Sequence, residues 1–197
     1  MIEVEVKAPV RDPRRIVRAL MDLGAKKRGK LVQKDTYYSH PARRLELTDE
    51  ALRIRVSEGR AVLAYKGPRL DGRSKSREEI EVGIGSAGAA HRVLLRLGFR
   101  PVGTVRKRRE LYTLRGLRVC LDRVEGLGVF LEVEKRVERK RYPAALETVL
   151  ALLRKLGLEE TERRSYLELI LLRGARRTGR SPPIKTRGTL SSPRRTP

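Results

Sequence analysis

Charged and apolar residues alternate through almost every segment of this chain that has strand character. The N-terminus reads Ile-Glu-Val-Glu-Val-Lys from residue 2, and similar alternation recurs at residues 52–56, 77–82 and 131–134. In an extended strand, residues i and i+2 point the same way, so Glu3, Glu5 and Lys7 share one face while Val4 and Val6 share the other. Each strand is therefore predicted to have one charged side and one apolar side.

The charges on these faces are sorted by sign. Some strands carry pairs of acids, such as Glu132 and Glu134, and others carry pairs of bases, such as Arg53 and Arg55. An ordinary solvated sheet face explains any one strand, but like charges side by side repel. Rows sorted in this way are stabilised best when they face one another across a closed lumen. The pattern favours an inside-out barrel whose charged interior holds ligands of both signs.

Eleven segments carry a recognisable period. Strands are expected at residues 2–8, 29–39, 51–57, 61–66, 76–83, 102–114, 117–124 and 129–137. Helices, each with one apolar stripe, are expected at residues 12–24, 87–97 and 143–156. The predicted fold class is therefore α+β: a closed antiparallel eight-stranded β-barrel with a charged lumen and with the helices packed outside.

A weak internal repeat supports this layout. An acid-apolar-acid strand followed by a helix that ends in Leu-Gly occurs three times, with the Leu-Gly pairs at residues 23–24, 97–98 and 156–157. In the first two copies a second strand ends in a tyrosine, Tyr38 or Tyr112, and these tyrosines lie 74 residues apart, as the first two glycines do. The repeat predicts duplicated βαβ-like halves and does not identify a function.

The composition divides the 197 residues into two parts. From Arg173 onward the chain is rich in Arg, Ser and Pro, has no acidic residue and shows no apolar periodicity. We therefore predict a tunnel domain over residues 1–172 and a disordered basic tail over residues 173–197. Lys and Arg number 47 against 24 Asp and Glu, a net charge of +23, so the folded part is basic in its own right and a polyanionic partner is expected.

Several classes of protein are disfavoured. No apolar run approaches the roughly 18 residues of a membrane span, and the strand pattern starts directly after Met1, so neither an anchor nor a secretory signal is expected. These features predict a cytoplasmic protein that does not bind membranes. Cys120 is the single cysteine, which leaves no internal disulfide and no structural zinc site.

The predicted lumen has the donors for a metal ion and for phosphate. Carboxylates without cysteine or a suitable histidine suit Mg²⁺ or Mn²⁺ better than zinc. Converging Arg and Lys side chains suit phosphate oxygens, with Arg able to bind two at once. A metal site next to a phosphate clamp is typical of phosphoryl or nucleotidyl transfer.

A set of motifs in fixed order carries a family resemblance. It starts with the ExExK pattern of Glu3, Glu5 and Lys7 and continues through residues 33–38, 51–55, 65–67, 77–81, 107–109, 121–122 and 131–134. Over residues 1–172 the chain resembles the CYTH domain family, the triphosphate tunnel enzymes that include class IV adenylate cyclases and thiamine triphosphatases. The tail has no counterpart in the family pattern.

The resemblance implies a role for each group of lumen residues. Residues that match the family's metal-holding positions are Glu3, Glu5, Asp122, Glu132 and Glu134. Those that would bind the triphosphate are Lys7, Arg53, Arg55, Lys66, Arg77, Lys107 and Arg109. Catalytic roles are implied for Lys7, Lys66 and Tyr37, the last as a partner of Lys7 that orients water. Glu79 and Glu81 match tunnel-lining positions, either near a metal or in ion pairs with the arginines.

Two reactions fit such a tunnel. Attack of the ribose 3′-hydroxyl on the α-phosphorus of ATP would give cyclic AMP and pyrophosphate, as in class IV adenylate cyclases, which is the function the resemblance favours. Attack of water would instead make the protein a triphosphatase for tripolyphosphate, thiamine triphosphate or a nucleoside triphosphate. Two Phe, six Tyr and no Trp offer no evident platform for the organic part of the substrate.

A non-enzymatic RNA- or DNA-binding protein is the alternative from another class, because the net charge and the tail favour nucleic acid. The scarcity of aromatic residues and the acidic pairs argue against this for the folded part. The expected partners are thus a small-molecule triphosphate and, through the tail, nonspecific nucleic acid. The assembly is left open between a monomer and a homodimer.

Overall fold

The computed structural model describes residues 1–72 and 74–178. Within these residues the strands are β1 Ile2–Pro9, β2 Lys26–Ser39, β3 Ala51–Ser57, β4 Arg60–Lys66, β5 Arg77–Ile84, β6 Arg100–Leu114, β7 Leu117–Val124 and β8 Gly128–Val137. Every predicted strand is present, with ends within a few residues of those expected. The alternation of charged and apolar residues therefore locates the strands.

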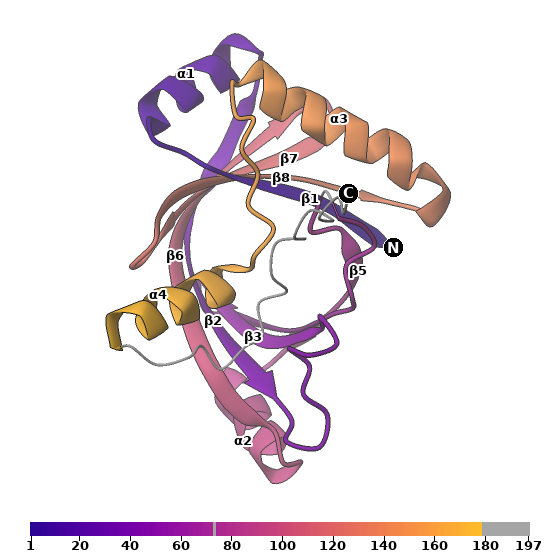
Figure 1. The fold of residues 1–197 in the computed structure, drawn as a ribbon, viewed down its shortest axis with the longest axis vertical. Helices are drawn as coiled ribbons and strands as arrows, with labels where there is room; N and C mark the ends of the chain where they lie inside the picture. Colours follow the sequence, from indigo (N-terminus) through magenta and orange to yellow (C-terminus); the bar gives the residue numbers. More distant parts are fainter. Residues whose placement is uncertain (73, 179–197) are drawn as a thin grey trace, which may run out of the picture.

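The strands close into a single antiparallel barrel. Their order is β1-β5-β4-β3-β2-β6-β7-β8, and β8 pairs with β1 to close the ring (Figure 1). The long β2 and β6 pair with each other over most of their length. The prediction of a closed eight-stranded antiparallel barrel is confirmed.

Three helices lie where the periodicity predicts them, as α1 Pro13–Asp22, α2 Ala87–Arg96 and α3 Tyr142–Lys155. The side chain of Asp12 accepts a hydrogen bond from the Arg15 amide, and that of Ser86 accepts one from the Ala89 amide. Both α1 and α2 therefore have side-chain N-caps. Gly24 and Gly98 follow α1 and α2 with φ of 85° and 87°, a conformation that glycine adopts without a steric penalty. These matching ends support the predicted repeat.

The main apolar core lies outside the barrel. Outward residues of β1, β7 and β8 pack against α1 and α3, which lie together on one side of the barrel in Figure 1. Val4, Val6 and Leu131 are almost fully buried in this layer. A smaller cluster joins α2 to the outer side of β2 and β3 through Leu94, Tyr38 and Ile54.

A fourth helix, α4 Tyr166–Thr178, was not predicted. It corrects the boundary placed at residue 173, because residues 173–178 are helical. The physical reason lies upstream, where Leu167, Leu169, Ile170 and Leu171 pack on the end of the barrel and start a helix that continues into the basic sequence. The rest of the predicted tail, from residue 179, lies outside the described residues.

Helix length and composition also bear on the membrane prediction. Among residues 1–72 and 74–178, no helix combines the length and the apolar character that a bilayer crossing requires.

Candidate functional site

Charged side chains fill the interior of the barrel. Inward acids are Glu3, Glu5, Asp35, Glu79, Glu81, Asp122, Glu132 and Glu134, and inward bases are Lys7, Arg53, Arg55, Lys66, Lys75, Arg77, Lys107 and Arg109. Arg118 and Arg136 join the bases at the mouth of the lumen, and most of the inward acids and bases are buried. Burial of so many charges is stable only when they are paired. The lumen predicted from the sorted rows is therefore present.

Asp35 of β2 lies against two arginines of β3. The Arg55 guanidinium donates two hydrogen bonds of 2.7 Å to the Asp35 carboxylate, and Arg53 Nη1 lies 3.5 Å from it. Burial opposes ionisation of Asp35, but the charges of Arg53 and the hydrogen bonds of Arg55 hold its pKa below the ordinary value. A guanidinium presented in this way is also suited to two phosphate oxygens.

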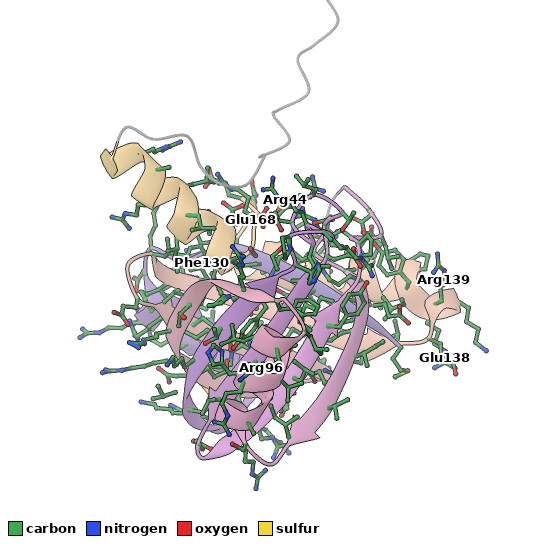
Figure 2. All side chains as sticks on the ribbon, turned by 90° about the horizontal axis from the view of Figure 1, so that it is seen from below. Arg44, Arg96, Phe130, Glu138, Arg139 and Glu168 are labelled. Atoms are coloured by element: carbon green, nitrogen blue, oxygen red, sulfur yellow. The ribbon has the colours of Figure 1, made fainter. Side chains whose placement is uncertain are left out.

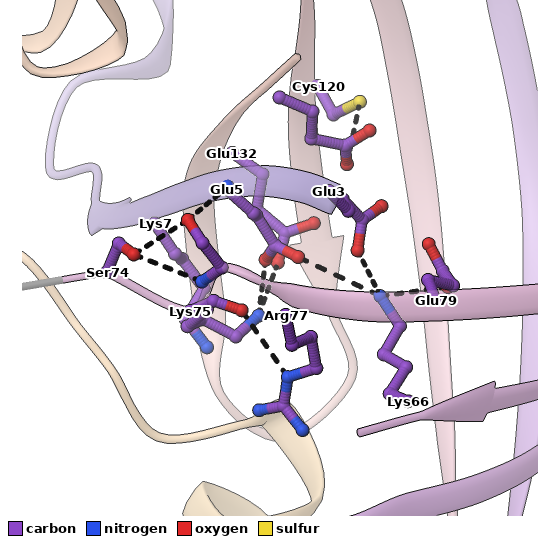
Figure 3. A network of polar contacts seen from close by, with 12 residues as sticks. Glu3, Glu5, Lys7, Lys66, Ser74, Lys75, Arg77, Glu79, Cys120 and Glu132 are labelled. Carbon is purple, nitrogen blue, oxygen red and sulfur yellow. Dashed lines mark hydrogen bonds and ion pairs between the residues drawn. The ribbon is translucent and has the colours of Figure 1, made fainter. Parts of the chain in front are cut away.

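Lys66 of β4 joins carboxylates from two other strands. Its Nζ lies 2.5 Å from Glu3, 2.9 Å from Glu79 and 4.0 Å from Glu5 (Figure 3). Burial alone would lower the pKa of Lys66, but the surrounding carboxylates, Glu3 foremost, raise it. Lys66 is therefore a fixed positive charge in the middle of the lumen.

Lys75 comes from the segment before β5 and occupies the neighbouring position. It forms an ion pair with Glu5 and lies 3.6 Å from Glu132 (Figure 3). The Glu5 amide also donates a hydrogen bond to the Ser76 hydroxyl, which fixes this segment against β1. Lys75 was not among the predicted site residues, although it continues the alternation of Arg77 and Glu79 by one step toward the N-terminus.

The third cluster is on β6, β7 and β8. Lys107 Nζ lies 2.8 Å from Asp122, and Arg109 donates a hydrogen bond of 2.6 Å to the same carboxylate. Arg109 also binds Glu132 and reaches Glu134 at 3.3 Å. Burial opposes ionisation of Glu132, but Lys107 and the other bases nearby hold its pKa well below the ordinary value. The ion pairs of Arg109 with Glu132 and Glu134 connect β6 to β8, which are not neighbours in the barrel.

Lys7 lies at the end of the barrel that α4 covers. Its Nζ donates a hydrogen bond of 2.5 Å to the Arg164 carbonyl and lies 4.1 Å from the centre of the Tyr166 ring. Burial, and then the charge of Lys75, lower the pKa of Lys7 to about 7. An amine with this pKa can exchange a proton near neutral pH.

Tyr166 at the start of α4 projects into this end of the lumen. Its hydroxyl donates a hydrogen bond of 3.1 Å to Asp122, and its ring packs on Phe130 with centroids 5.2 Å apart. Figure 2 shows Phe130 and Glu168 of α4 at the same end of the barrel. Leu167, next to Tyr166, approaches Gly103 so closely that a Cβ there would clash at 2.5 Å. The α4 side of the tunnel is thus lined by apolar and aromatic groups.

A narrow cavity of about 70 Å³ lies between these side chains. Its lining reaches from Ser165 and Tyr166 to Arg118 and Arg136, and it includes bases and acids from every cluster described above. Arg118 and Arg136 are half exposed, so the cavity meets solvent among cations. A cavity with such walls suits a compact polyanion.

The carboxylates have the donor chemistry of a Mg²⁺ or Mn²⁺ site. Glu5 and Glu134 lie directly opposite each other on β1 and β8, and burial together with the charges of Glu3 and Glu5 raises the pKa of Glu134. This excess of negative charge is what a divalent cation would neutralise. In the described residues the carboxylates are held by Lys and Arg, and no three acids, histidines or cysteines converge on one point. Metal binding would therefore require Lys66 or Lys75 to release its partners.

The remaining predicted residues are placed as follows. Arg77 lines the cavity and binds the carbonyls of Asp49 and Gly67. Glu79 and Glu81 form ion pairs with Arg53 and Arg136, and a role for them near a metal stays a prediction.

The pairing of Tyr37 with Lys7 is not found. No hydrogen bond joins the two within the part of the chain that the structure describes, and Tyr37 packs instead with Val105 and Leu167 below α4. Tyr166 is the tyrosine over Lys7. No signal marked it in the sequence, because it comes from a segment without strand alternation that reaches the lumen only through the tertiary fold.

Comparisons with known proteins bear directly on this site. A model of the CYTH domain matches residues 1–166. The chain belongs to the CYTH family. A Methanocaldococcus jannaschii protein named "Putative adenylate cyclase MJ0240" is 41% identical over 172 residues, 86% of this chain and 98% of that protein. The adenylate cyclase CyaB of Aeromonas hydrophila is 30% identical over 142 residues, 70% of this chain and 71% of that one.

The fold is shared with solved structures of similar sequence. The PH1819 protein of Pyrococcus horikoshii OT3 superimposes with a TM-score of 0.81 at 43% identity, and the match covers 87% of this chain and 99% of that one. The inside-out barrel of this CYTH protein is therefore the architecture of a homologue as well.

Proposed function

We propose that this CYTH protein is a divalent-metal-dependent enzyme that cleaves the phosphate chain of a triphosphate. The observation that carries the proposal is the closed lumen in which lysines and arginines of some strands hold the carboxylates of others. A triphosphate and its metal ions would bring both signs together and replace those pairs without leaving a charge unpaired.

Each cluster has a distinct part in this scheme. Arg53 and Arg55 on β3, Lys66 on β4, and Lys107 and Arg109 on β6 would bind phosphate oxygens from different sides and hold the chain for in-line attack. When bound, a divalent cation would be held by Glu3, Glu5 and Glu134 and would neutralise charge on the phosphate oxygens. Lys7, whose pKa is lowered to about 7 by burial and by the charge of Lys75, would accept or donate a proton at the α4 end of the lumen.

Hydrolysis is the reaction that the lining of the cavity supports best. Many lining residues can bind phosphate, whereas the aromatic residues of the lining are Tyr37 and Tyr166. Tyr37 packs against α4, and Tyr166 belongs to α4 and packs on Phe130. The site therefore recognises the phosphate chain more than an organic group.

Cyclisation of ATP is the second candidate. It is favoured by the names of the two relatives at 41% and 30% identity, which are "Putative adenylate cyclase MJ0240" and "Adenylate cyclase CyaB". The same lumen would serve this reaction, with the ribose 3′-hydroxyl in place of water as the nucleophile.

The test is a panel of tripolyphosphate, ATP and thiamine triphosphate with Mg²⁺ or Mn²⁺, in which phosphate, pyrophosphate and cyclic AMP are measured separately. We expect metal-dependent release of phosphate. Cyclic AMP and pyrophosphate in equal amounts would instead establish the cyclase, and turnover of none of these compounds would contradict the proposal.

The variant Arg55→Ala sharpens the test. Asp35 keeps Arg53 as a partner, so the barrel should fold, while loss of one phosphate contact should reduce kcat/KM by about 100-fold or more. Arg139→Ala, an exposed arginine outside the barrel, is the matched control and should retain full activity. Equal activity of the two variants would count against the tunnel as the site.

A further inference from the structure

Four bases form a positively charged face on the outside of the barrel. Lys34 on β2, Arg106 and Arg108 on β6, and Arg123 on β7 are all exposed. They alternate with lumen residues such as Lys107 and Asp122, so their side chains lie on the opposite side of the sheet from the cavity. We call these four residues the basic face.

The pairing of the strands places like charges directly opposite one another. Lys34 is the cross-strand partner of Arg106, and Arg108 is the partner of Arg123. Like charges in such positions destabilise a sheet. None of the four side chains forms an ion pair or a hydrogen bond within residues 1–72 and 74–178.

The nearest acids do not neutralise this face. Glu110, further along β6, is bound by Lys27 at 2.9 Å and lies 4.0 Å from Lys30. Glu125, whose amide binds the Arg106 carbonyl, is a single exposed acid at the edge. The acids inside the lumen offset most of the bases there, so most of the net charge of +23 lies outside the lumen, and part of it is concentrated here.

We propose that the basic face binds the phosphate backbone of single-stranded nucleic acid. Neighbouring Lys and Arg residues of the basic face are separated by roughly 5–7 Å. A nucleic acid strand, which carries one phosphate per nucleotide, can follow such a row. The face is the convex outside of a closed barrel, so a flexible strand can curve over it whereas a flat bilayer would touch only a narrow strip. This inference is independent of the triphosphate chemistry in the lumen.

The binding is independent of base sequence. The outward residues next to the basic face on β2 and β6 are Val32, Thr36 and Thr104, which provide no aromatic ring for stacking and no set of donors for reading nucleobases. The contacts are therefore to phosphates alone, and affinity falls steeply as salt rises.

The test compares two full-length quadruple variants with the unmodified protein. The first is Lys34→Gln, Arg106→Gln, Arg108→Gln and Arg123→Gln. The control removes the same charge from exposed bases on α1, the 3₁₀ turn Arg139–Arg141 and α3, as Arg14→Gln, Arg18→Gln, Arg139→Gln and Lys155→Gln. All three proteins keep residues 179–197, so the tail contributes equally to each.

Binding is measured by fluorescence anisotropy with 20-nucleotide poly(U) and poly(dT) that carry a 5′-hydroxyl, over a series of KCl concentrations. The basic-face variant should lose about tenfold or more in affinity at 0.1 M salt, and its log K against log salt slope should fall by about 3. The control should lose less than about threefold. Equal losses in the two variants, or no loss in the first, would overturn the proposal.

Two further measurements separate this face from other sites. Arg55→Ala should bind the oligonucleotides unchanged, because a loss there would place the nucleic acid in the lumen and overturn the proposal. The basic-face variant should retain full triphosphate turnover and the circular dichroism of the unmodified protein. If that variant lost binding to phosphatidylserine vesicles while its oligonucleotide binding stayed intact, the face would be a membrane contact instead.

Discussion

The two repeat-related units, β1–α1–β2 and β5–α2–β6, start from the same sequence pattern and end in different environments. Both begin with an acid-apolar-acid strand, and in both the helix has a side-chain N-cap and a glycine after its end. Their inward acids all reach the lumen. Their outward faces, however, differ in what covers them.

The outer face of β1 is part of the main core, whereas that of β5 is open. Val4 and Val6 are 0% and 1% exposed, but Ile80 and Val82 are 52% and 56% exposed. The reason is the position of the helices, because α1 and α3 both lie over the β1 side whereas α2 packs on β3. Equivalent alternation therefore fixes which residues face the lumen without fixing which outward residues become core.

The largest expected effect is a difference in protein stability between substitutions on the outer faces of β1 and β5. Val6→Asp places an unpaired carboxylate under α1 and α3 and should lower the free energy of unfolding by roughly 4 kcal/mol or more. Val82→Asp, at the equivalent face of β5, should cost about 1 kcal/mol or less. Equilibrium urea unfolding measures both.

If Val6→Asp does not fold, the more conservative substitutions Val6→Ala and Val82→Ala still allow the stabilities of the two faces to be compared. Loss of two buried methyl groups should cost about 2 kcal/mol at Val6. Equal costs at the two positions would mean that the β5 face is covered in solution.

A second prediction compares the inward acids of the same two strands and rests on the proposed function. Glu5→Gln removes a buried charge that binds Lys75 and should lower kcat/KM for the triphosphate by about 100-fold. Glu81→Gln should lower it by less than about tenfold, because Glu81 is 31% exposed and solvent screens its pair with Arg136. Steady-state kinetics with matched metal concentrations distinguish them, and equal losses would show that the lumen acts as one undivided site.

The smallest effects concern the helix caps. Asp12→Ala and Ser86→Ala each remove a side-chain acceptor from a helix N-terminus and should each cost about 1 kcal/mol. Asp12→Asn and Ser86→Asp retain an acceptor and serve as controls. If Ser86→Ala left the global unfolding transition unchanged, α2 would unfold separately from the barrel.

Sequence reasoning located most of the site because the lumen is built on strands with a period of two. The alternation of the two strand faces alone predicted that Glu5, Arg55 and Lys107 point into the lumen. One further step of the same alternation would have included Lys75. Tyr166 could not be found in this way. It enters the lumen from the end of the barrel, and its position depends on how Leu167 and its neighbours pack on the inward side of β6.

The amino-acid sequence by itself determined the strands, their inward charged faces and the closure of the barrel, because alternation and sorted charge are local properties that only a closed charged lumen satisfies. The tertiary structure decided which bases pair with which acids, which apolar face is covered, and that α4 ends the tunnel over Lys7. These features depend on contacts between segments far apart in the chain, and a local alternation of residues does not predict such contacts.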